Sequence, residues 1–397
     1  MNDASIGRRR FLGIAGAAAG ASVLTPHAIA SPRRPSCAGP PRRAFIGGYT
    51  VAADTLTGVA APGIGLAGID PVTGQLTVDG YYPGVANSFY LALSADRNVL
   101  YAVSDVPGGR VYALRIAAEG SLEPINDQST EGAGAIYLSV HPSGRYLLTA
   151  NYDSGSVVVN PIRRDGGLGP VTDLVQHTGS GPVPGQQQGP HPHQTVTDPT
   201  GRRVLVPDKG NDSVYVYAFD LATGQLTQES QVRMAPGTGP RHLVFHPSGR
   251  HIYLVGELSS SVTVFRYDPG SGALRPVHTV STVPPGTDPR NAPSGIRLSA
   301  DARFAYVANR GLDSIAIFAV EHGGRTLRSL AQQPIGALPF GNIQPYDLVL
   351  DPTGRFLYAA DTVGMTVAEF LVNRGTGLLT PLAGPAVTPS PVSIVLR

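Results

Sequence analysis

Cysteine is almost absent from this chain of 397 residues. The one cysteine, Cys37, has no second cysteine with which to form an internal disulfide bond, so a disulfide-bonded scaffold is excluded. Cys37 also lacks the apolar residues that should precede a lipid-modified cysteine, and we expect it to be incidental. Lysine is equally scarce, because it occurs once, at Lys209, against 29 arginines.

Long hydrophobic runs are lacking too. The apolar run from Phe11 to Leu24 is 14 residues long, too short to cross a bilayer, and we expect no membrane anchor. It follows Arg8-Arg9-Arg10 and precedes the small-x-small sequence Ala28-Ile29-Ala30. This pattern predicts that residues 1–30 are a twin-arginine signal peptide, which exports a folded protein to the periplasm or the exterior. The proline- and arginine-rich residues 31–42 are predicted to be a linker.

There is no excess of charge of either sign. The formal charge is +2, and loss of residues 1–30 removes three arginines and one aspartate, which leaves about zero. A neutral balance gives no reason to expect a nucleic-acid or anionic-membrane partner. We expect a monomer.

A short motif repeats along the chain. "HPSGR" occurs at 141–145 and 246–250, "DPTGR" occurs at 198–202 and 351–355, and degenerate copies stand at 94–98 and 299–303. The fifth residues of these copies are 47, 57, 48, 53 and 52 residues apart, within the range that is typical of propeller blades.

Each motif lies between two short runs of alternating apolar residues, and a third run and an irregular fourth stretch follow it. Four strands joined by Gly, Asp and Pro turns make one blade, and no stretch after residue 30 has a helical period. "RAFIGGYT" (43–50) is a second strand without its first, and "SPVSIVLR" (390–397) is a first strand without the rest. Joined in space, they complete a seventh blade. We therefore predict an all-β, seven-bladed propeller over 43–397, with four antiparallel strands per blade and both termini in one blade.

Aligning the repeats separates scaffold positions from unusual ones. One register in the first strands holds Phe89, Ile136, His193, Arg241, Ser294, Tyr346 and Val392. The register at the ends of the second strands holds Tyr49, Asp105, Tyr152, Lys209, Glu257, Arg310 and Thr362. Three successive units have unusual residues in both, namely His193 with Lys209, Arg241 with Glu257, and Ser294 with Arg310.

The start of an inner strand and the end of its antiparallel neighbour lie at the same rim. We therefore expect His193, Lys209, Arg241, Glu257 and Arg310 to converge at one mouth of the central channel. A base, a carboxylate and several cations gathered there would form an anion-binding acid–base site.

Two neighbouring histidines are expected to differ. His193 occupies the register that faces the channel, whereas His191 should line the loop above it and contact substrate with Tyr152 and Lys209. His242, one position beyond its register residue, points to the opposite face of a regular strand, and we expect it to pack in the interior.

Simpler explanations stay open. An ion pair between adjacent strands would account for Arg241 and Glu257, and a hydrogen-bonded strand-end residue would account for His193. A metal site fits less well, because the neighbours of His193 are cations and only Glu257 is well placed as an oxygen ligand. The sequence has no G-x-S-x-G, P-loop or Rossmann fingerprint, and we expect no metal and no cofactor.

Four segments in order resemble a known family. "GPHPHQTVTDPTGR", "GPRHLVFHPSG", "GELSSSVTVF" and "PSGIRLSADARFAYVANRGLDSIAIF" are similar to the seven-bladed β-propeller lactonase family. Its members include propeller-type 6-phosphogluconolactonases and carboxymuconate-lactonizing enzymes, and the resemblance covers essentially all of the chain after the signal peptide. The family's proposed active-site residues fall on His193, Arg241, Glu257 and Arg310. In two departures, Tyr346 stands where the family commonly has arginine, and Gly256 replaces an asparagine.

The resemblance implies hydrolysis of a small anionic or polyhydroxylated lactone without a metal. Arg241 and Arg310 would bind the anionic group and stabilise the oxyanion, and either His193 or Glu257 would act as general base on water. Export fits poorly with a cytosolic sugar phosphate as substrate. Two alternatives stay open: a cycloisomerase that closes a carboxymuconate-like diacid into a lactone, and a non-catalytic secreted propeller that binds a ligand or a protein.

Overall fold

A computed structural model of the chain describes residues 42–287, 291–336 and 344–397. Within these ranges the chain consists of β-strands and one short 3₁₀ turn, η1 (Ala52–Asp54). None of the described residues belongs to a helix long and apolar enough to cross a membrane. The predicted signal peptide, Cys37 and all but the last residue of the predicted linker lie outside the described residues.

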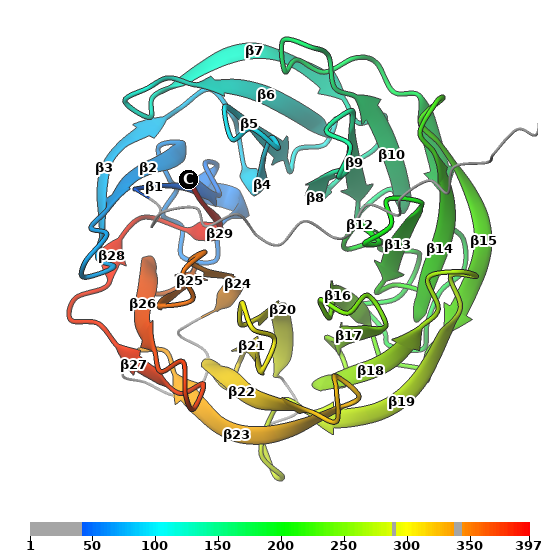
Figure 1. Ribbon diagram of the computed structural model, residues 1–397. Helices are drawn as coiled ribbons and strands as arrows, with labels where there is room; N and C mark the ends of the chain where they lie inside the picture. Colours follow the sequence, from blue (N-terminus) through cyan, green and yellow to red (C-terminus); the bar gives the residue numbers. More distant parts are fainter. Residues whose placement is uncertain (1–41, 288–290, 337–343) are drawn as a thin grey trace, which may run out of the picture. The chain divides into compact units, whose positions relative to one another are not determined.

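The strands form seven antiparallel sheets arranged in a ring, which we number as blades 1 to 7 (Figure 1). Blades 1 to 6 run outward from the central channel in chain order. In blade 7 the inner strand is β29, and it is followed outward by β1, β2 and β3. Ala44 of β1 pairs with Leu396 of β29, and Ile46 pairs with Ile394. The predicted seven-bladed propeller with a blade shared by both ends of the chain is confirmed.

The strand bounds are as follows. Blade 1 contains β4 (Ser88–Leu93), β5 (Val99–Ser104), β6 (Arg110–Ile116) and β7 (Leu122–Ser129), and blade 2 contains β8 (Ala135–Val140), β9 (Tyr146–Asn151), β10 (Ser156–Pro161) and β11 (Asp173–Gln176). Blade 3 contains β12 (Val196–Thr197), β13 (Arg203–Asp208), β14 (Ser213–Asp220) and β15 (Gln225–Arg233), and blade 4 contains β16 (Pro240–Phe245), β17 (His251–Gly256), β18 (Ser261–Tyr267) and β19 (Leu274–Ser281). Blade 5 contains β20 (Ala292–Leu298), β21 (Phe304–Arg310), β22 (Ser314–Glu321) and β23 (Thr326–Pro334). Blade 6 contains β24 (Pro345–Leu350), β25 (Phe356–Asp361), β26 (Thr366–Val372), β27 (Leu379–Pro381) and β28 (Ala386–Val387), and blade 7 contains β29 (Pro391–Leu396), β1 (Arg43–Gly48), β2 (Ile64–Ile69) and β3 (Leu76–Tyr82).

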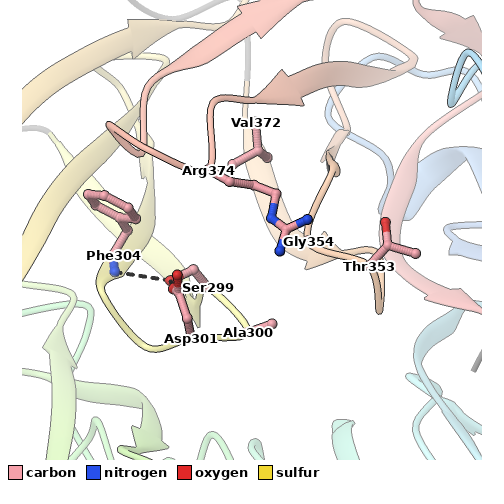
Figure 2. A pocket seen from close by; sticks show the side chains of 8 residues that line it. All are labelled: Ser299, Ala300, Asp301, Phe304, Thr353, Gly354, Val372 and Arg374. Atoms are coloured by element: carbon pink, nitrogen blue, oxygen red, sulfur yellow. Dashed lines mark hydrogen bonds between the residues drawn. The ribbon is translucent and has the colours of Figure 1, made fainter. Parts of the chain in front are cut away.

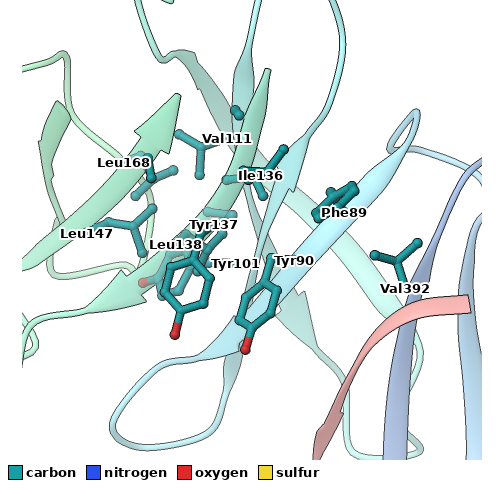
Figure 3. Packing of buried hydrophobic residues seen from close by; sticks show 14 of the residues in the cluster. Phe89, Tyr90, Tyr101, Val111, Ile136, Tyr137, Leu138, Leu147, Leu168 and Val392 are labelled. Carbon is teal, nitrogen blue, oxygen red and sulfur yellow. The ribbon is translucent and has the colours of Figure 1, made fainter. Parts of the chain in front are cut away.

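The hydrophobic core lies between the blades. Among the described residues, seven clusters of buried side chains join consecutive blades, as expected where twisted sheets pack face to face. In the cluster between blades 1 and 2, Tyr101 of β5 and Leu147 of β9 are fully buried (Figure 3). The alternating apolar residues of each strand therefore hold neighbouring blades together.

A tyrosine hydroxyl also ties blades together at one rim. Tyr253 near the start of β17 donates to the carbonyl oxygen of Gly324 in the next blade, at 2.9 Å. Tyr306 makes the same bond to Gly377 at 3.0 Å. The two glycines have φ angles of 95° and 77°, in the left-handed region that favours glycine. The turn of each following blade is thus fixed against its neighbour.

A β-bulge recurs near the start of the inner strands. The register shifts between Ser88 and Tyr90 in β4, and between Pro240 and Leu243 in β16. The inner strands β8, β20 and β24 shift at the equivalent place. A bulge places two residues opposite one on the partner strand and turns the local backbone. Two consecutive side chains can therefore face the channel.

Candidate active site

One register at the ends of the second strands is built in the same way in most blades. The backbone N–H of Tyr152 donates to the carbonyl of Gly134 at 2.7 Å, and that of Glu257 donates to Gly239 at 2.8 Å. Lys209 bonds to His191 in the same way at 3.0 Å. Each bond ties the end of the second strand to the segment that leads into the first strand of its blade. The repeat alignment therefore corresponds to a true structural register at one rim.

Glu257 is the centre of an ionic cluster at this rim. Its Oε1 lies 2.9 Å from Lys209 Nζ. Its Oε2 lies 2.7 Å from Arg241 Nε and 2.9 Å from an Arg310 terminal nitrogen. All four side chains are largely buried, and that of Arg241 is 2% exposed. The structure thus brings Lys209, Arg241, Glu257 and Arg310 together from blades 3, 4 and 5.

The cluster carries more positive than negative charge. One carboxylate faces three cations, so the group has an excess of two positive charges. Burial by itself raises the pKa of Glu257, but the cations Arg310, Lys209 and Arg241 outweigh it and hold that pKa far below its ordinary value. Burial, followed by Arg310, lowers the pKa of Arg241 to about 10. Arg241 Nη1 has no hydrogen-bond partner among the described residues. The cluster can therefore accept an anion.

His193 lies beside this cluster without joining it. It precedes the short strand β12, and its backbone N–H donates to the carbonyl of Pro207 at 3.0 Å. The residue is 6% exposed, and its Nδ1 has no hydrogen-bond partner within the described part of the chain. Burial, followed by the positive charges of Arg241 and Lys209, lowers the pKa of His193 well below its ordinary value. His193 is thus a neutral imidazole with a free nitrogen.

His242 packs in the interior as expected, against Tyr90 and Tyr137, but the expectation that it points to the face opposite Arg241 is wrong. His242 lines the same small cavity as His193, Arg241 and Tyr346. The bulge in β16 is the physical reason, because it breaks the alternation that would place Arg241 and His242 on opposite faces. His242 is 2% exposed, and neither ring nitrogen has a hydrogen-bond partner in the described ranges. The cavity is small, with room for about one water molecule.

His191 belongs to the loop above His193. Its ring stacks on Tyr152 with 4.3 Å between centroids, and its Nδ1 lies 2.8 Å from the Tyr152 carbonyl oxygen. Lys209 Nζ donates to the Tyr152 hydroxyl at 3.1 Å and to Gln186 Oε1 at 2.6 Å. The glutamine-rich loop therefore supports Lys209, and Gln186 is a rim residue that the repeats did not reveal, because it lies outside them.

Aromatic rings form the other side of this rim. Tyr49 and Phe89 meet edge to face at 5.7 Å, and Phe89 and Tyr346 do so at 6.1 Å. The guanidinium of Arg310 lies 5.0 Å from the centre of the Tyr346 ring. Tyr346 therefore joins the aromatic side to the cationic side through a cation–π contact.

Asp105 lies in the same register as Glu257, and the sequence pattern alone does not mark it as a site residue. Burial, followed by the nearby Asp153 and Asp54, raises the pKa of Asp105 to about 6. Asp105 also acts on the hydroxyl of Tyr49, whose pKa is raised first by burial. The available signal was that Asp105 and Glu257 are the two acidic residues of this register. Ser294, by contrast, donates its hydroxyl to the Pro345 carbonyl at 2.6 Å and holds two blades together.

Two further observations limit what the rim can hold. In the part of the chain that the structure describes, no group of three or more His, Cys, Asp and Glu side chains is arranged to hold a metal ion. A Cβ atom at Gly256 would lie 2.5 Å from Ser259 Oγ and 2.9 Å from Thr238 Cγ2. The glycine before Glu257 is therefore matched to its tight surroundings.

Fold and site together define a seven-bladed β-propeller with a buried, cationic cluster at one mouth. The model of the family "Lactonase, 7-bladed beta-propeller" matches residues 43–396. The chain belongs to this lactonase family of β-propellers, whose members act on cyclic esters, and it is a lactonase.

Individual relatives of the chain are also named as lactonases. The 6-phosphogluconolactonase of Bacillus subtilis (strain 168) is 35% identical over 312 residues, which cover 78% of this chain and 87% of the relative. The 6-phosphogluconolactonase of Pectobacterium carotovorum is 32% identical over 305 residues, 76% of this chain and 86% of the relative. Among solved structures, a periplasmic gluconolactonase of Pseudomonas aeruginosa has a TM-score of 0.82 and 30% identity, covering 89% of this chain and 98% of that one.

Proposed function

We propose that the chain hydrolyses a small polyhydroxylated or anionic sugar lactone at the cationic mouth, outside the cytoplasm. The observation that carries this proposal is the ion cluster, in which Glu257 is surrounded by Arg241, Arg310 and Lys209 beside the neutral His193. The names of the relatives support sugar lactones, with and without a phosphate, as the substrate class. The twin-arginine pattern at Arg8-Arg9 supports export.

His193 is the better general base of the two candidates. Glu257 already pairs with three cations through its two carboxylate oxygens, so it is poorly placed to take a proton from water. His193 has an unpartnered nitrogen and no charge. In this mechanism water attacks the lactone carbonyl carbon while His193 takes one proton from the water. The ring C–O bond then breaks, and the departing ring oxygen receives the proton from His193, which yields a hydroxy acid.

Arg241 and Arg310 would stabilise the negative charge that develops on the carbonyl oxygen. Arg241 Nη1 is already buried and lacks a partner, so little reorganisation is needed when the oxyanion forms. Glu257 would be a positioning residue, because it fixes both guanidinium groups and Lys209 without using its own basicity. The aromatic side formed by Tyr49, Phe89 and Tyr346 would contact the carbon face of the sugar ring.

The test compares His193→Gln, Arg241→Lys, Glu257→Gln and the exposed control Arg328→Gln on gluconolactone with and without a 6-phosphate. His193→Gln should lower kcat by roughly 10²–10⁴-fold, the usual cost of losing a general base. Glu257→Gln should also lose activity and should melt at a lower temperature, because removing the anion of a buried ion cluster leaves uncompensated cations. The control should match the parent.

One outcome would place the reaction elsewhere, and two others would point to the other functions. Full turnover in every site variant would show that the reaction does not occur at this mouth. Ring closure of a carboxymuconate, detected by product analysis without consumption of water, would instead identify a cycloisomerase. Binding of a lactone without turnover by the parent chain would identify a non-catalytic propeller.

A further inference from the structure

A second charged site lies on blade 4, at the strand ends farthest from Glu257. A hollow of about 730 Å³ there is lined by basic side chains, namely Arg250, His251, Arg266, Arg275 and Arg325, with Asp268 as its acidic member. His251 begins β17 and Glu257 follows its end, so the hollow and the mouth are separated by about 20 Å along the strand. We call this feature the blade 4 basic hollow.

Three of its basic residues form a row across the sheet. His251 of β17 pairs directly with Arg266 of β18, and Arg266 pairs with Arg275 of β19. Directly opposed residues project from the same face, and neighbouring strands are about 4.8 Å apart. The row thus places basic groups at intervals of about 5 Å. Like charges directly opposite each other destabilise a sheet. A bound anion would offset this repulsion.

The other blades do not have such a row. The equivalent row in each of the other blades starts at the first residue of the second strand and continues through its paired residues in the outer strands. In blades 1, 2, 3, 5, 6 and 7 in turn, these rows are Val99–Arg115–Glu123, Tyr146–Pro161, Arg203–Ala218–Thr227, Phe304–Ala319–Arg328, Phe356–Leu371–Thr380 and Arg43–Gly68–Thr77. Each of these rows has at most one basic residue, and in blade 1 the arginine faces a glutamate. The basic row is therefore a special feature of blade 4.

The arginines of the hollow also lack salt-bridge partners among the described residues. Within the described ranges, Arg250, Arg266, Arg275 and Arg325 form no salt bridge, whereas Arg203 and Arg328 elsewhere do. Asp268 instead accepts hydrogen bonds in its own turn, from the Gly270 N–H at 2.9 Å and the Ser271 hydroxyl at 3.0 Å.

The pKa of His251 is lowered by the same excess of positive charge. Burial lowers its pKa first, and His246, Arg325, Arg266 and Arg250 lower it further. Its Nδ1 has no hydrogen-bond partner among the residues that the structure describes.

The groove between blades 5 and 6 provides an internal comparison. It is lined by the turns that precede β21 and β25 and by Val372 and Arg374, and it is smaller, about 220 Å³ (Figure 2). It is lined by one acid, Asp301, and one base, Arg374, and Asp301 is paired with Arg303 at 2.7 Å. A groove at a blade turn therefore forms in this propeller without a row of basic residues.

We propose that the blade 4 basic hollow binds a polyvalent oxyanion whose charged groups are about 5 Å apart, such as neighbouring acidic groups along a sugar or phosphate chain. Guanidinium groups suit phosphate, sulfate and carboxylate because they donate two parallel hydrogen bonds. A row of opposed cations favours several linked anions over a single one. Arg325 belongs to blade 5, in the turn held by the Tyr253–Gly324 bond, so both blades contribute to the site. This site is distinct from the lactone site and does not depend on the proposed reaction.

Calorimetric titration of the protein with inorganic phosphate, tripolyphosphate and trigalacturonate tests the proposal. One of the two polyvalent ligands should bind at least tenfold more tightly than inorganic phosphate, and the affinity should fall as salt screens the charges. Preference for tripolyphosphate would identify linked phosphates as the ligand source, and preference for trigalacturonate would identify acidic sugars.

The variant R266Q/R275Q and its matched control R328Q/R374Q each remove two positive charges, and R325Q removes one. R266Q/R275Q should weaken binding at least tenfold, with a melting temperature no lower than that of the parent, because it relieves repulsion. R325Q, from the neighbouring blade, should also weaken binding. R328Q/R374Q should bind like the parent, and all variants should keep lactone turnover. Absence of binding by both polyvalent ligands at low salt would overturn the proposal, as would an equal loss in R328Q/R374Q.

Discussion

His193 and His242 meet edge to face, with 5.2 Å between ring centroids and 78° between ring planes. They come from consecutive blades, and the β16 bulge places the second ring against the first. Both imidazoles are buried beside Arg241, and burial followed by that cation lowers the pKa of each well below its ordinary value. A pair of neutral rings therefore forms part of the floor of the cationic mouth.

Alanine at His193 and at His191 should have very different effects. His193→Ala should lower kcat by roughly 10²–10⁴-fold, because it removes the proposed base. His191→Ala should keep most activity and raise KM, because His191 stacks on Tyr152 above the site. Steady-state kinetics on the preferred lactone, with melting temperatures as the folding control, measure this difference. Equal losses of kcat in both variants, restored by added zinc, would contradict the assignment.

Acid should destabilise the protein through the buried histidine pair. Below pH 6.5, the ordinary pKa of about 6.5 means that a histidine in the unfolded chain binds a proton. His242 in the folded protein does not, because burial, as the main cause, lowers its pKa. The unfolded chain then binds more protons, and the free energy of unfolding falls by up to about 1.4 kcal/mol per pH unit for each such histidine. Above pH 6.5 this dependence disappears.

Urea unfolding of the parent and of His242→Leu between pH 7.5 and 5 measures the effect. The variant should lose less stability on acidification than the parent, while His322→Asn, at an exposed histidine, should follow the parent. Parallel curves for His242→Leu and the parent would mean that His242 is protonated in the folded protein.

Tyr346 should control discrimination between phosphorylated and unphosphorylated lactones. Tyr346→Arg would place a further cation next to Arg310, and a charge-assisted hydrogen bond to a phosphate should raise the preference for the 6-phosphorylated lactone by about tenfold or more. Tyr346→Phe keeps the ring beside Arg310 and should leave the preference unchanged. The measurement is the ratio of kcat/KM for the two lactones. An unchanged ratio in Tyr346→Arg would show that the phosphate is held elsewhere.

Changing Arg8-Arg9 to Lys-Lys should block export and processing. The precursor, about thirty residues longer than the processed form, should then accumulate inside the cell, because the twin-arginine pathway requires the arginine pair. Cell fractionation and mass determination of the intact chain measure this. Normal processing of the variant would remove the twin-arginine assignment and the objection to a phosphorylated substrate.

The fold was predictable because its evidence is periodic. The "HPSGR" and "DPTGR" motifs mark the same turn in successive blades, and the incomplete strands at 43–50 and 390–397 could pair only with each other. Register alone also placed Arg241, Glu257 and Arg310 together, because equivalent positions of a propeller share one rim.

The remaining parts of the site depend on departures from regular geometry. Strict alternation places His242 on the wrong face, because a bulge cannot be recognised from side-chain pattern alone. Gln186 reaches Lys209 from an irregular loop for which the repeats provide no register. Asp105 depends on Asp153 and Asp54, whose distance in space is unknown until the blades are placed. Regular positions were therefore predictable, and the irregular ones required coordinates.

The pairing of β1 with β29 also dictates an order of events during synthesis. β1 leaves the ribosome almost a whole chain length before the strand that covers its inner edge. Until then, blade 7 lacks its inner strand, and Val392, which lines the cavity beside His193, is not yet made. A nascent chain therefore carries an open sheet edge and an unfinished mouth throughout elongation. Ring closure and completion of the site coincide, so activity can arise only in chains that have been translated through β29.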